Sequence, residues 1–121
     1  MTSPQARRGD IWLADLDPVR GNEQAGIRPV IVISVTRVGT SRSGMAIVVP
    51  VTSTDRLHHG AIRIPAGEGG LRRDSYALPL QLRAIARERL ITRWGVATTT
   101  TVEQVANVVR IAIGVEPPPR G

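Results

Sequence analysis

The chain has 121 residues, 41% of them hydrophobic, which is the length and composition of a single globular domain. Its formal net charge is +6 and all sixteen basic residues are arginine, so we expect an anionic partner, either a nucleic acid or an acidic protein. Cysteine is absent, which excludes disulfides and thiol chemistry. No signal-peptide or membrane-spanning run is recognisable, and we expect a cytoplasmic protein with no membrane partner.

Residues 1–121 are expected to form one domain, with a folded core over about 9–115. A polar lead-in at 1–8 should be loose, and the proline-rich tail at 116–121 favours extended backbone. Aromatic residues are scarce, and both Trp12 and Trp94 are expected in the core, with stacking on a base as the alternative role of Trp12. Valine, isoleucine, leucine and alanine must fill the rest, and the β-branched ones favour a sheet.

Apolar runs predict the first strands at 10–16, 30–35 and 45–51. Because these runs are nearly continuous, the strands should be covered on both faces. The segment 36–44 between the second and third strands contains glycine, serine and arginine, and we expect it to be a flexible basic connection.

The second half of the chain alternates short apolar runs with breaks. Strands are predicted at 61–64, 75–82 and 90–97, and a single helical turn at 84–88. Pro79 inside the second of these strands indicates a sheet edge or a bulge.

One amphipathic helix closes the chain. Thr100 and Glu103 have capping-box spacing, and Gly114 can end the helix. Apolar residues on one face follow at helical spacing: Val102, Val105, Ala106, Val109, Ala112 and Ile113. Strands followed by one helix predict an α+β fold with a small, strongly bent antiparallel sheet.

Most motifs of metal and cofactor enzymes are missing from the sequence. It has no Walker loop, dinucleotide fingerprint, HExxH motif or cysteine zinc site. His58 and His59 are adjacent, so in an extended segment they point to opposite faces and make a poor metal pair. A Ser-His-Asp arrangement remains open from spacing alone, although no nucleophile-elbow motif supports it. An enzyme of this composition is expected to need no metal and no cofactor.

Metal-free RNA cleavage fits this inventory, because the ribose 2′-OH serves as the nucleophile. The protein then supplies a proton acceptor, a proton donor and positive charge for the phosphorane. Arg28 is a candidate because Pro29 fixes the backbone after it, although an Arg paired with a surface carboxylate would look the same. Thr52, at a strand end, can donate to a phosphate oxygen or can be a turn residue that bonds its own backbone.

An ordered series of motifs in the first third of the chain resembles the MazF/PemK toxin endoribonucleases. It comprises Gly-Asp-Ile-Trp at 9–12, Asp-Pro-Val-Arg-Gly-Asn-Glu-Gln-Ala-Gly at 17–26 and Arg-Pro-Val at 28–30. The resemblance implies an SH3-like barrel with a C-terminal helix, and an Arg and a Thr, here Arg28 and Thr52, acting together at the scissile phosphate. It covers about 9–114 and is weakest at 35–60.

The loop before Arg28 carries the remaining catalytic candidate. Arginine is rarely deprotonated in proteins, so Arg28 would be a poor general base, and we expect it to stabilise charge, with proton donation as a further role. Glu23 is then either the carboxylate base, a group that orients Arg28, or a structural ion-pair partner. Its neighbours Asn22 and Gln24 are predicted to contact RNA.

A further group of polar residues, at 72–83, is predicted to bind the phosphates and base edges of RNA. Ser53, beside the candidate Thr52, is predicted to bind RNA as well. The group at 72–83 resembles the family's Arg-Asp-Ser and Gln-x-Arg motifs, which help to bind RNA or to shape the dimer. Its members are Arg72, Arg73, Asp74, Ser75, Gln81 and Arg83. The Leu-Pro-Leu sequence before Gln81 departs from the family pattern and makes the local strand geometry uncertain.

The leading hypothesis is the toxin of a type II toxin–antitoxin pair, a sequence-specific, ribosome-independent endoribonuclease of single-stranded RNA. The resemblance implies 2′,3′-cyclic phosphate and 5′-OH products, a homodimer, and a MazE-like antitoxin with an acidic disordered tail. The substrate class is left open among messenger, ribosomal and transfer RNA. The alternatives are a CcdB-like gyrase poison on the same fold and an SH3-like nucleic-acid-binding module without chemistry.

Overall fold

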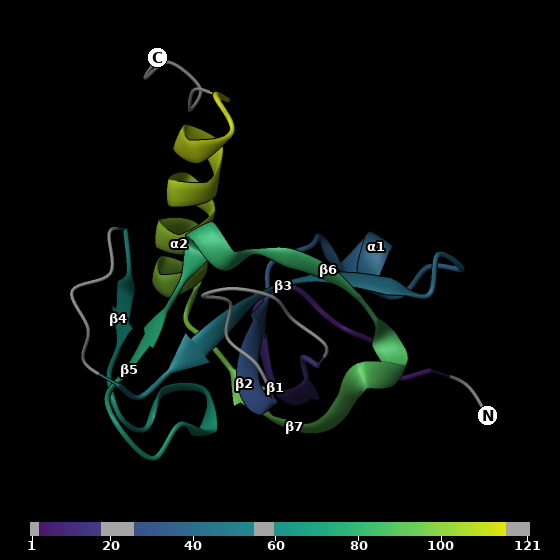
Figure 1. Cartoon of the computed structure of the whole chain (residues 1–121), viewed down its shortest axis with the longest axis horizontal. Coiled ribbons are helices and arrows are strands. Elements are labelled where there is room, and N and C mark those ends of the chain that lie inside the picture. The colour runs from purple at the N-terminus through teal and green to yellow at the C-terminus, as the bar shows by residue number, and fades with distance from the viewer. Residues whose placement is uncertain (1–2, 18–25, 55–59, 116–121) are drawn as a thin grey trace.

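The structure is a computed structural model that describes residues 3–17, 26–54 and 60–115 (Figure 1). The predictions for His58, His59 and the tail at 116–121 therefore lie outside the described residues. Helix α2 and strands β4 and β5 lie on one side of the molecule in Figure 1, and β1, β2 and β7 on the other.

The described residues form a seven-stranded antiparallel sheet in the order β4-β5-β3-β2-β1-β7, with β6 also paired to β3. The strands are β1 (Asp10–Asp15), β2 (Ile27–Val32), β3 (Met45–Thr52), β4 (Ile62–Ile64), β5 (Ser75–Ala77), β6 (Arg83–Ala86) and β7 (Leu90–Val96). The helices are α1 (Thr36–Gly39) and α2 (Thr99–Ala112), and the 3₁₀ turns are η1 (Glu68–Gly70), η2 (Pro79–Gln81) and η3 (Arg87–Arg89). The sheet is bent but its end strands β4 and β7 do not pair, and the predicted α+β class with a bent antiparallel sheet is confirmed.

Both faces of the central strands are buried, as predicted from their continuous apolar runs. Along β2, Ile31 belongs to a cluster that includes Val102 and Val105 of α2. Its neighbours Val30 and Val32 belong to a second cluster on the other face, with Ile85 and Leu90. Successive side chains of a strand point to opposite faces, so one strand contributes to two cores.

The segment after β5 differs from the prediction. A single strand at 75–82 was expected, but the strand stops at Ala77 and Pro79 begins the 3₁₀ turn η2. The chain then returns to the sheet as β6, and the helical turn expected at 84–88 is found slightly later, as the 3₁₀ turn η3. Both β5 and β6 pair with β3, which has eight residues: β5 pairs with its last two residues and β6 with its first four. The turn at Pro79 lies between β5 and β6, and the register of pairing with β3 changes across it.

The N-terminal half also differs in two places. β2 begins at Ile27, which places Arg28 and Pro29 inside the strand. The lead-in, expected to be loose, is packed at Ala6, which is fully buried and donates its N–H to the carbonyl of Gly39 at 3.0 Å. The connection expected to be flexible contains the short helix α1, whose Gly39 approaches Ala6 so closely that an added Cβ would lie 1.9 Å from the Ala6 carbonyl oxygen.

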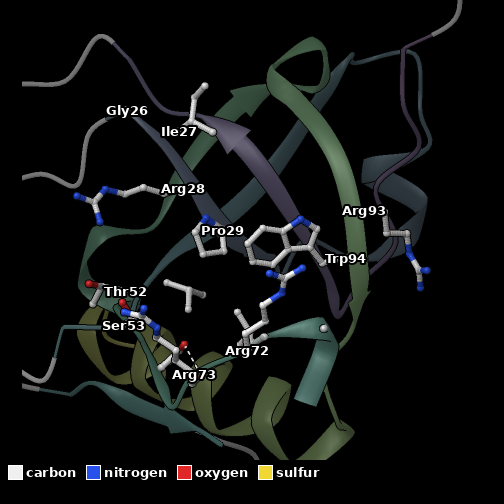
Figure 2. Close-up of a pocket in the computed structure, with 14 residues that line it drawn as sticks. Gly26, Ile27, Arg28, Pro29, Thr52, Ser53, Arg72, Arg73, Arg93 and Trp94 are labelled. Atoms are coloured by element: carbon white, nitrogen blue, oxygen red, sulfur yellow. Dashed lines mark hydrogen bonds between the residues drawn. The ribbon is translucent and has the colours of Figure 1, made fainter. Parts of the chain in front are cut away.

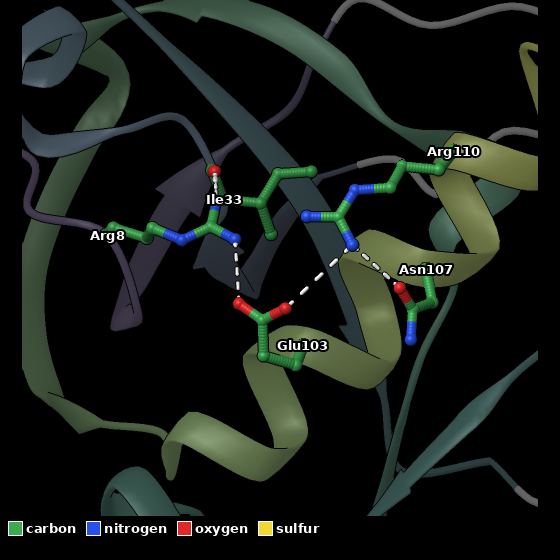
Figure 3. Close-up of polar contacts among 5 residues, drawn as sticks. All are labelled: Arg8, Ile33, Glu103, Asn107 and Arg110. Atoms are coloured by element: carbon green, nitrogen blue, oxygen red, sulfur yellow. Dashed lines mark hydrogen bonds and ion pairs between the residues drawn. The ribbon is translucent and has the colours of Figure 1, made fainter. Parts of the chain in front are cut away.

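Helix α2 is capped two residues earlier than predicted. The Thr98 hydroxyl accepts the Thr101 N–H at 3.2 Å, whereas Thr100 lies inside the helix. The predicted capping partner Glu103 instead pairs with Arg8 at 3.5 Å and with Arg110 at 3.9 Å (Figure 3). Glu103 thus ties the helix to the lead-in of the chain.

The apolar face of α2 is shorter than predicted. Val102, Val105 and Ala106 are buried, but Ile113 is 69% exposed. The predicted stripe therefore packs against the core from Val102 to Val109, which is partly buried there, and the last turn of the helix extends beyond the sheet (Figure 1).

Three glycines allow η1 to pack directly on β7. A Cβ on Gly95 would lie 2.7 Å from the carbonyl carbon of Gly69, and a Cβ on Gly70 would lie 2.5 Å from the carbonyl oxygen of Trp94. Real Cβ atoms are not found at such distances, so these contacts require glycine. Gly95 is the clearest case, because its φ is not positive and only the steric contact excludes a side chain.

We therefore expect Gly95→Ala to destabilise the fold by about 1–3 kcal/mol, because overpacking forces the backbone of η1 away from β7. Denaturant unfolding of the purified protein measures this change. Thr92→Ala on the same strand is the control and should change stability by less than about 0.5 kcal/mol, since Thr92 is exposed. Equal stability of Gly95→Ala and the native protein would contradict the close contact.

Asp74 closes the turn between β4 and β5. Its carboxylate accepts the Ala66 N–H at 2.9 Å and the Arg63 guanidinium at 2.8 Å. The backbone bond from Ala66 and the bond from Arg63 together lower the pKa of the Asp74 carboxyl. Because the folded pKa is the lower one, this contact stabilises the fold above the unfolded pKa and is lost as the pH falls through the folded pKa.

An NMR titration of the Asp74 carboxyl should give a pKa below the ordinary value of 3.8. In Arg63→Ala the pKa should rise but stay below 3.8, because the Ala66 N–H bond is the larger cause and remains. Arg42→Ala, which removes an exposed arginine elsewhere, should leave the titration unchanged. A pKa that does not move in Arg63→Ala would show that this ion pair has no influence on the carboxyl.

Candidate functional site

The pairing of β2 with β3 brings the two main catalytic candidates to the same end of the sheet. Val30 pairs with Pro50 in an antiparallel register. Continued by two residues, this register places Arg28 of β2 opposite Thr52, the last residue of β3. Residues opposite each other on neighbouring strands project to the same face, so residues 24 positions apart in sequence come to one site.

Thr52 is well fixed at the end of β3. Only 4% of it is exposed, and its hydroxyl oxygen accepts the Thr54 N–H at 3.2 Å. This is the turn bond that the sequence left as an alternative. A hydroxyl that accepts one bond can still donate its proton, so the bond orients Thr52 and is compatible with donation to a ligand.

Arg28 and Thr52 both line an open pocket of about 1010 Å³ (Figure 2). Four of the predicted RNA-binding residues line it as well: Ser53, Arg72, Arg73 and Ser75. In Figure 2, Arg28 extends toward the side of the pocket where Thr52 and Ser53 lie. The structure thus gathers residues of β2, β3 and the segment before β5 around one cavity.

The pocket is strongly basic. The described residues that line it include four arginines, Arg28, Arg72, Arg73 and Arg93, and no acidic residue. A cavity lined by one sign of charge concentrates ions of the opposite sign. Guanidinium groups also bind phosphate in a planar, bidentate manner, so the lining is suited to a phosphodiester.

Ser75 lines the pocket, but its hydroxyl stabilises the neighbouring backbone. It is 3% exposed, and its hydroxyl donates to the Arg73 carbonyl at 2.9 Å. This bond fixes the backbone from which Arg73 extends. Arg72 and Arg73 themselves are exposed.

Three predicted RNA-binding residues do not line the pocket. Asp74 faces Arg63 and Ala66 in the turn described above. Gln81 is half-buried in η2. Arg83 donates to the Leu16 carbonyl at 2.9 Å, so its guanidinium supports the chain at the end of β1.

The predicted residues Asn22, Glu23 and Gln24 lie outside the described residues, but the two ends of their loop are described. The Leu16 N–H donates to the Gly26 carbonyl at 2.9 Å, and the Gly26 N–H donates to the Asp17 carboxylate at 2.9 Å. Arg89 donates to the carbonyls of Asp15 and Asp17. The described residues on either side of 18–25 are therefore hydrogen-bonded to each other next to Arg28.

Sequence reasoning missed two residues of the pocket, Arg93 and Trp94, both on β7. The Arg93 Nε donates to the Asp10 carboxylate at 3.1 Å, and Asp10 is 2% exposed. Asp10 also accepts the Arg7 N–H at 3.0 Å and the Trp12 indole N–H at 3.3 Å. Arg93 thus anchors β7 to β1, and in Figure 2 its side chain points away from Trp94.

The prediction that Trp94 lies in the core is wrong. Trp94 is 40% exposed, whereas Trp12 packs half-buried against the second core cluster. In Figure 2 the indole of Trp94 points into the pocket between Pro29 and Arg72. No sequence signal distinguished the two tryptophans, because both stand in apolar strand patterns.

Within the described residues, no group of three or more His, Asp or Glu side chains is placed to hold a metal ion. No helix among them is long and apolar enough to cross a membrane.

Comparisons with known proteins agree on one family. A model of the PemK-like, MazF-like toxins of type II toxin–antitoxin systems matches residues 7–113. Endoribonuclease MazF9 of Mycobacterium tuberculosis is 34% identical over 110 residues, which are 87% of this chain and 93% of that protein.

Solved structures show the same fold. The crystal structure of MazF from Deinococcus radiodurans matches with a TM-score of 0.78 at 23% identity, over 94% of this chain and 99% of that one. A MazE–MazF crystal structure from the same organism matches with a TM-score of 0.77 at 22% identity, over 93% and 99%. Since the family model spans most of the sequence, this chain belongs to the PemK-like, MazF-like toxins of type II toxin–antitoxin systems.

Proposed function

We propose that the protein is a toxin endoribonuclease that cleaves single-stranded RNA at a short sequence, without the ribosome. The observation that carries this proposal is the placement of Arg28 and Thr52 by the β2–β3 register in a pocket lined by arginines. The relative from Mycobacterium tuberculosis is named an endoribonuclease, which supports the same activity here. Messenger RNA is the proposed substrate, with ribosomal and transfer RNA as further candidates. The proposed place of action is the cytoplasm, where these RNAs are found.

The proposed reaction uses the substrate's own 2′-hydroxyl. Its oxygen forms a bond to the adjacent phosphorus while the bond from phosphorus to the 5′-oxygen breaks, which yields a 2′,3′-cyclic phosphate and a 5′-OH. Arg28 stabilises the charge of the phosphorane and donates the proton to the departing oxygen, and Thr52 donates to a non-bridging oxygen. The proton of the 2′-OH goes to Glu23, whose loop is held at its base beside Arg28. No step requires a metal or a cofactor.

The net charge of +6 also suits the proposed protein partner, a MazE-like antitoxin with an acidic, disordered tail. A MazE–MazF crystal structure exists for the fold relative from Deinococcus radiodurans, which supports this pairing. RNA and an acidic peptide would compete for the same arginines, so occupation of the pocket by the antitoxin would block cleavage. We propose a homodimer as the active form, by family resemblance.

Arg28→Ala should lower the rate of RNA cleavage by about 100-fold or more, since it removes the charge that stabilises the phosphorane. Thr52→Val keeps the shape and removes the hydroxyl, and should lower the rate by roughly 10-fold or more. Arg42→Ala is the matched control, because it removes the same charge from an exposed position outside the pocket lining. Cleavage of a long RNA and mapping of its ends measure all four proteins.

Four outcomes would each contradict a different part of the proposal. Intact RNA with the native protein would remove the nuclease function and favour a CcdB-like poison. Binding of RNA without cleavage would favour a nucleic-acid-binding module. Cleavage that stops in EDTA would remove the metal-free mechanism, and cleavage that is unchanged in Arg28→Ala would remove the role of Arg28.

The role of Glu23 is tested by its pH dependence. If Glu23 accepts the 2′-OH proton, Glu23→Gln should lower cleavage by about 100-fold or more and abolish the acidic limb of the pH–rate profile. A group that only orients Arg28 would lower the rate but leave the limb in place. A native rate in Glu23→Gln would exclude both roles.

A further inference from the structure

Trp94 is an unusual residue to find at the surface of this protein. The sequence has only two tryptophans and no phenylalanine, so large apolar side chains for the core are scarce. Nevertheless Trp94 is 40% exposed and points into the basic pocket (Figure 2). Burying a tryptophan would contribute more to stability than any other side chain, so its exposure needs a reason.

The register between β1 and β7 explains how Trp94 reaches the pocket. Ile11 pairs with Gly95, but the next residue, Trp12, pairs with Arg93. Trp94 is therefore the extra residue of a β-bulge and has no residue opposite it in β1. A bulge bends its strand and redirects the side chain of the extra residue, and bulges are common beside active sites.

The backbone under Trp94 is held on both sides. Gly70 of η1 packs so closely that an added Cβ would lie 2.5 Å from the Trp94 carbonyl oxygen. On the preceding residue, Arg93 is tied to the buried Asp10 at 3.1 Å. The indole therefore stands on a fixed base, and little conformational freedom is lost when a ligand packs on it.

The surroundings of the indole select a particular class of ligand. Arg72 extends toward the indole from one side and Pro29 lies on the other, and the next residue toward the sheet end is Arg28. A phosphodiester held by the arginines would place its attached base against a planar apolar surface. Base–aromatic stacking is the main way in which proteins hold unpaired bases.

We propose that Trp94 is a stacking platform for one nucleobase adjacent to the scissile phosphate, and so a residue that binds and positions the substrate. This inference rests on the proposed function and deepens it, since it assigns a base subsite to the same pocket. Trp12 has a different role, because it is half-buried and its indole N–H is bonded to Asp10.

The test uses a short single-stranded RNA that spans the mapped cleavage site, with a 2′-deoxynucleotide at the cleaved position so that it binds without reacting. Trp94→Leu should weaken binding about 10-fold or more, while Trp94→Phe should retain most of the affinity. Ile91→Ala is the matched control, because Ile91 is also a bulge residue of β7, is 50% exposed and does not line the pocket. It should bind as the native protein does.

The base that stacks on Trp94 is identified by measuring how intact and abasic RNAs bind to the native protein and to Trp94→Leu. Removal of one particular base should weaken binding to the native protein about 10-fold but have little effect on Trp94→Leu, because that variant has already lost the stack. In Trp12→Phe, where Trp94 is the only tryptophan, the same RNA should quench the fluorescence and the abasic RNA should quench it less.

Two results separate the failure of this inference from failure of the proposed function. If the native protein binds RNA but Trp94→Leu binds equally well, with the same abasic penalties, the stacking platform is overturned and the nuclease function stands. Unchanged fluorescence in Trp12→Phe on binding of RNA would overturn the platform as well. If the native protein neither binds nor cleaves RNA, the proposed function falls, and the platform with it.

Discussion

The antiparallel pairing of β2 with β3 is the constraint on which both the core and the candidate site depend. It brings Arg28 opposite Thr52, and it places the fully buried Val30, Ile31 and Val32 between two cores. A slip of one residue would send every β2 side chain to the wrong face. Because both faces are apolar and packed, such a slip would cost stability on both, so the packing that stabilises the sheet also fixes the catalytic geometry.

The positive charge of the chain serves two purposes that composition alone does not separate. Several arginines donate within the protein: Arg83 to the Leu16 carbonyl, Arg89 to the carbonyls that precede the 18–25 loop, and Arg93 to the buried Asp10. Arg72 and Arg73, by contrast, are exposed in the pocket. These scaffold arginines hold β7 and the chain on either side of residues 18–25, so they shape the site, and of the three only Arg93 also lines the pocket.

Much of the fold could be predicted from the sequence, because continuous runs of Val and Ile have few alternatives to buried strands. The 3₁₀ turn at Pro79, the cap at Thr98 and the exposure of Trp94 could not be predicted. Each depends on a tertiary partner. The 3₁₀ turn depends on the length of β3, the cap on η1, whose Glu68 carboxylate accepts the Thr98 N–H at 3.1 Å, and the exposure of Trp94 on the register of β1 against β7. The same holds for the pocket, where residue types indicated Arg28 and Thr52 but only strand pairing brings them together.

The Gly-Asp-Ile-Trp motif at 9–12 shows how scaffold and site are linked. Gly9, at φ +92°, donates its N–H to the Val32 carbonyl and its carbonyl accepts the Ala97 N–H, so it joins the end of β2 to the segment between β7 and α2. Asp10 holds Arg93, and the register shift after Ile11 produces the bulge at Trp94. None of the four motif residues at 9–12 lines the pocket, yet together they set the position of β7, whose bulge supplies one wall of it. A motif at the start of the chain can therefore determine substrate contacts made more than eighty residues later.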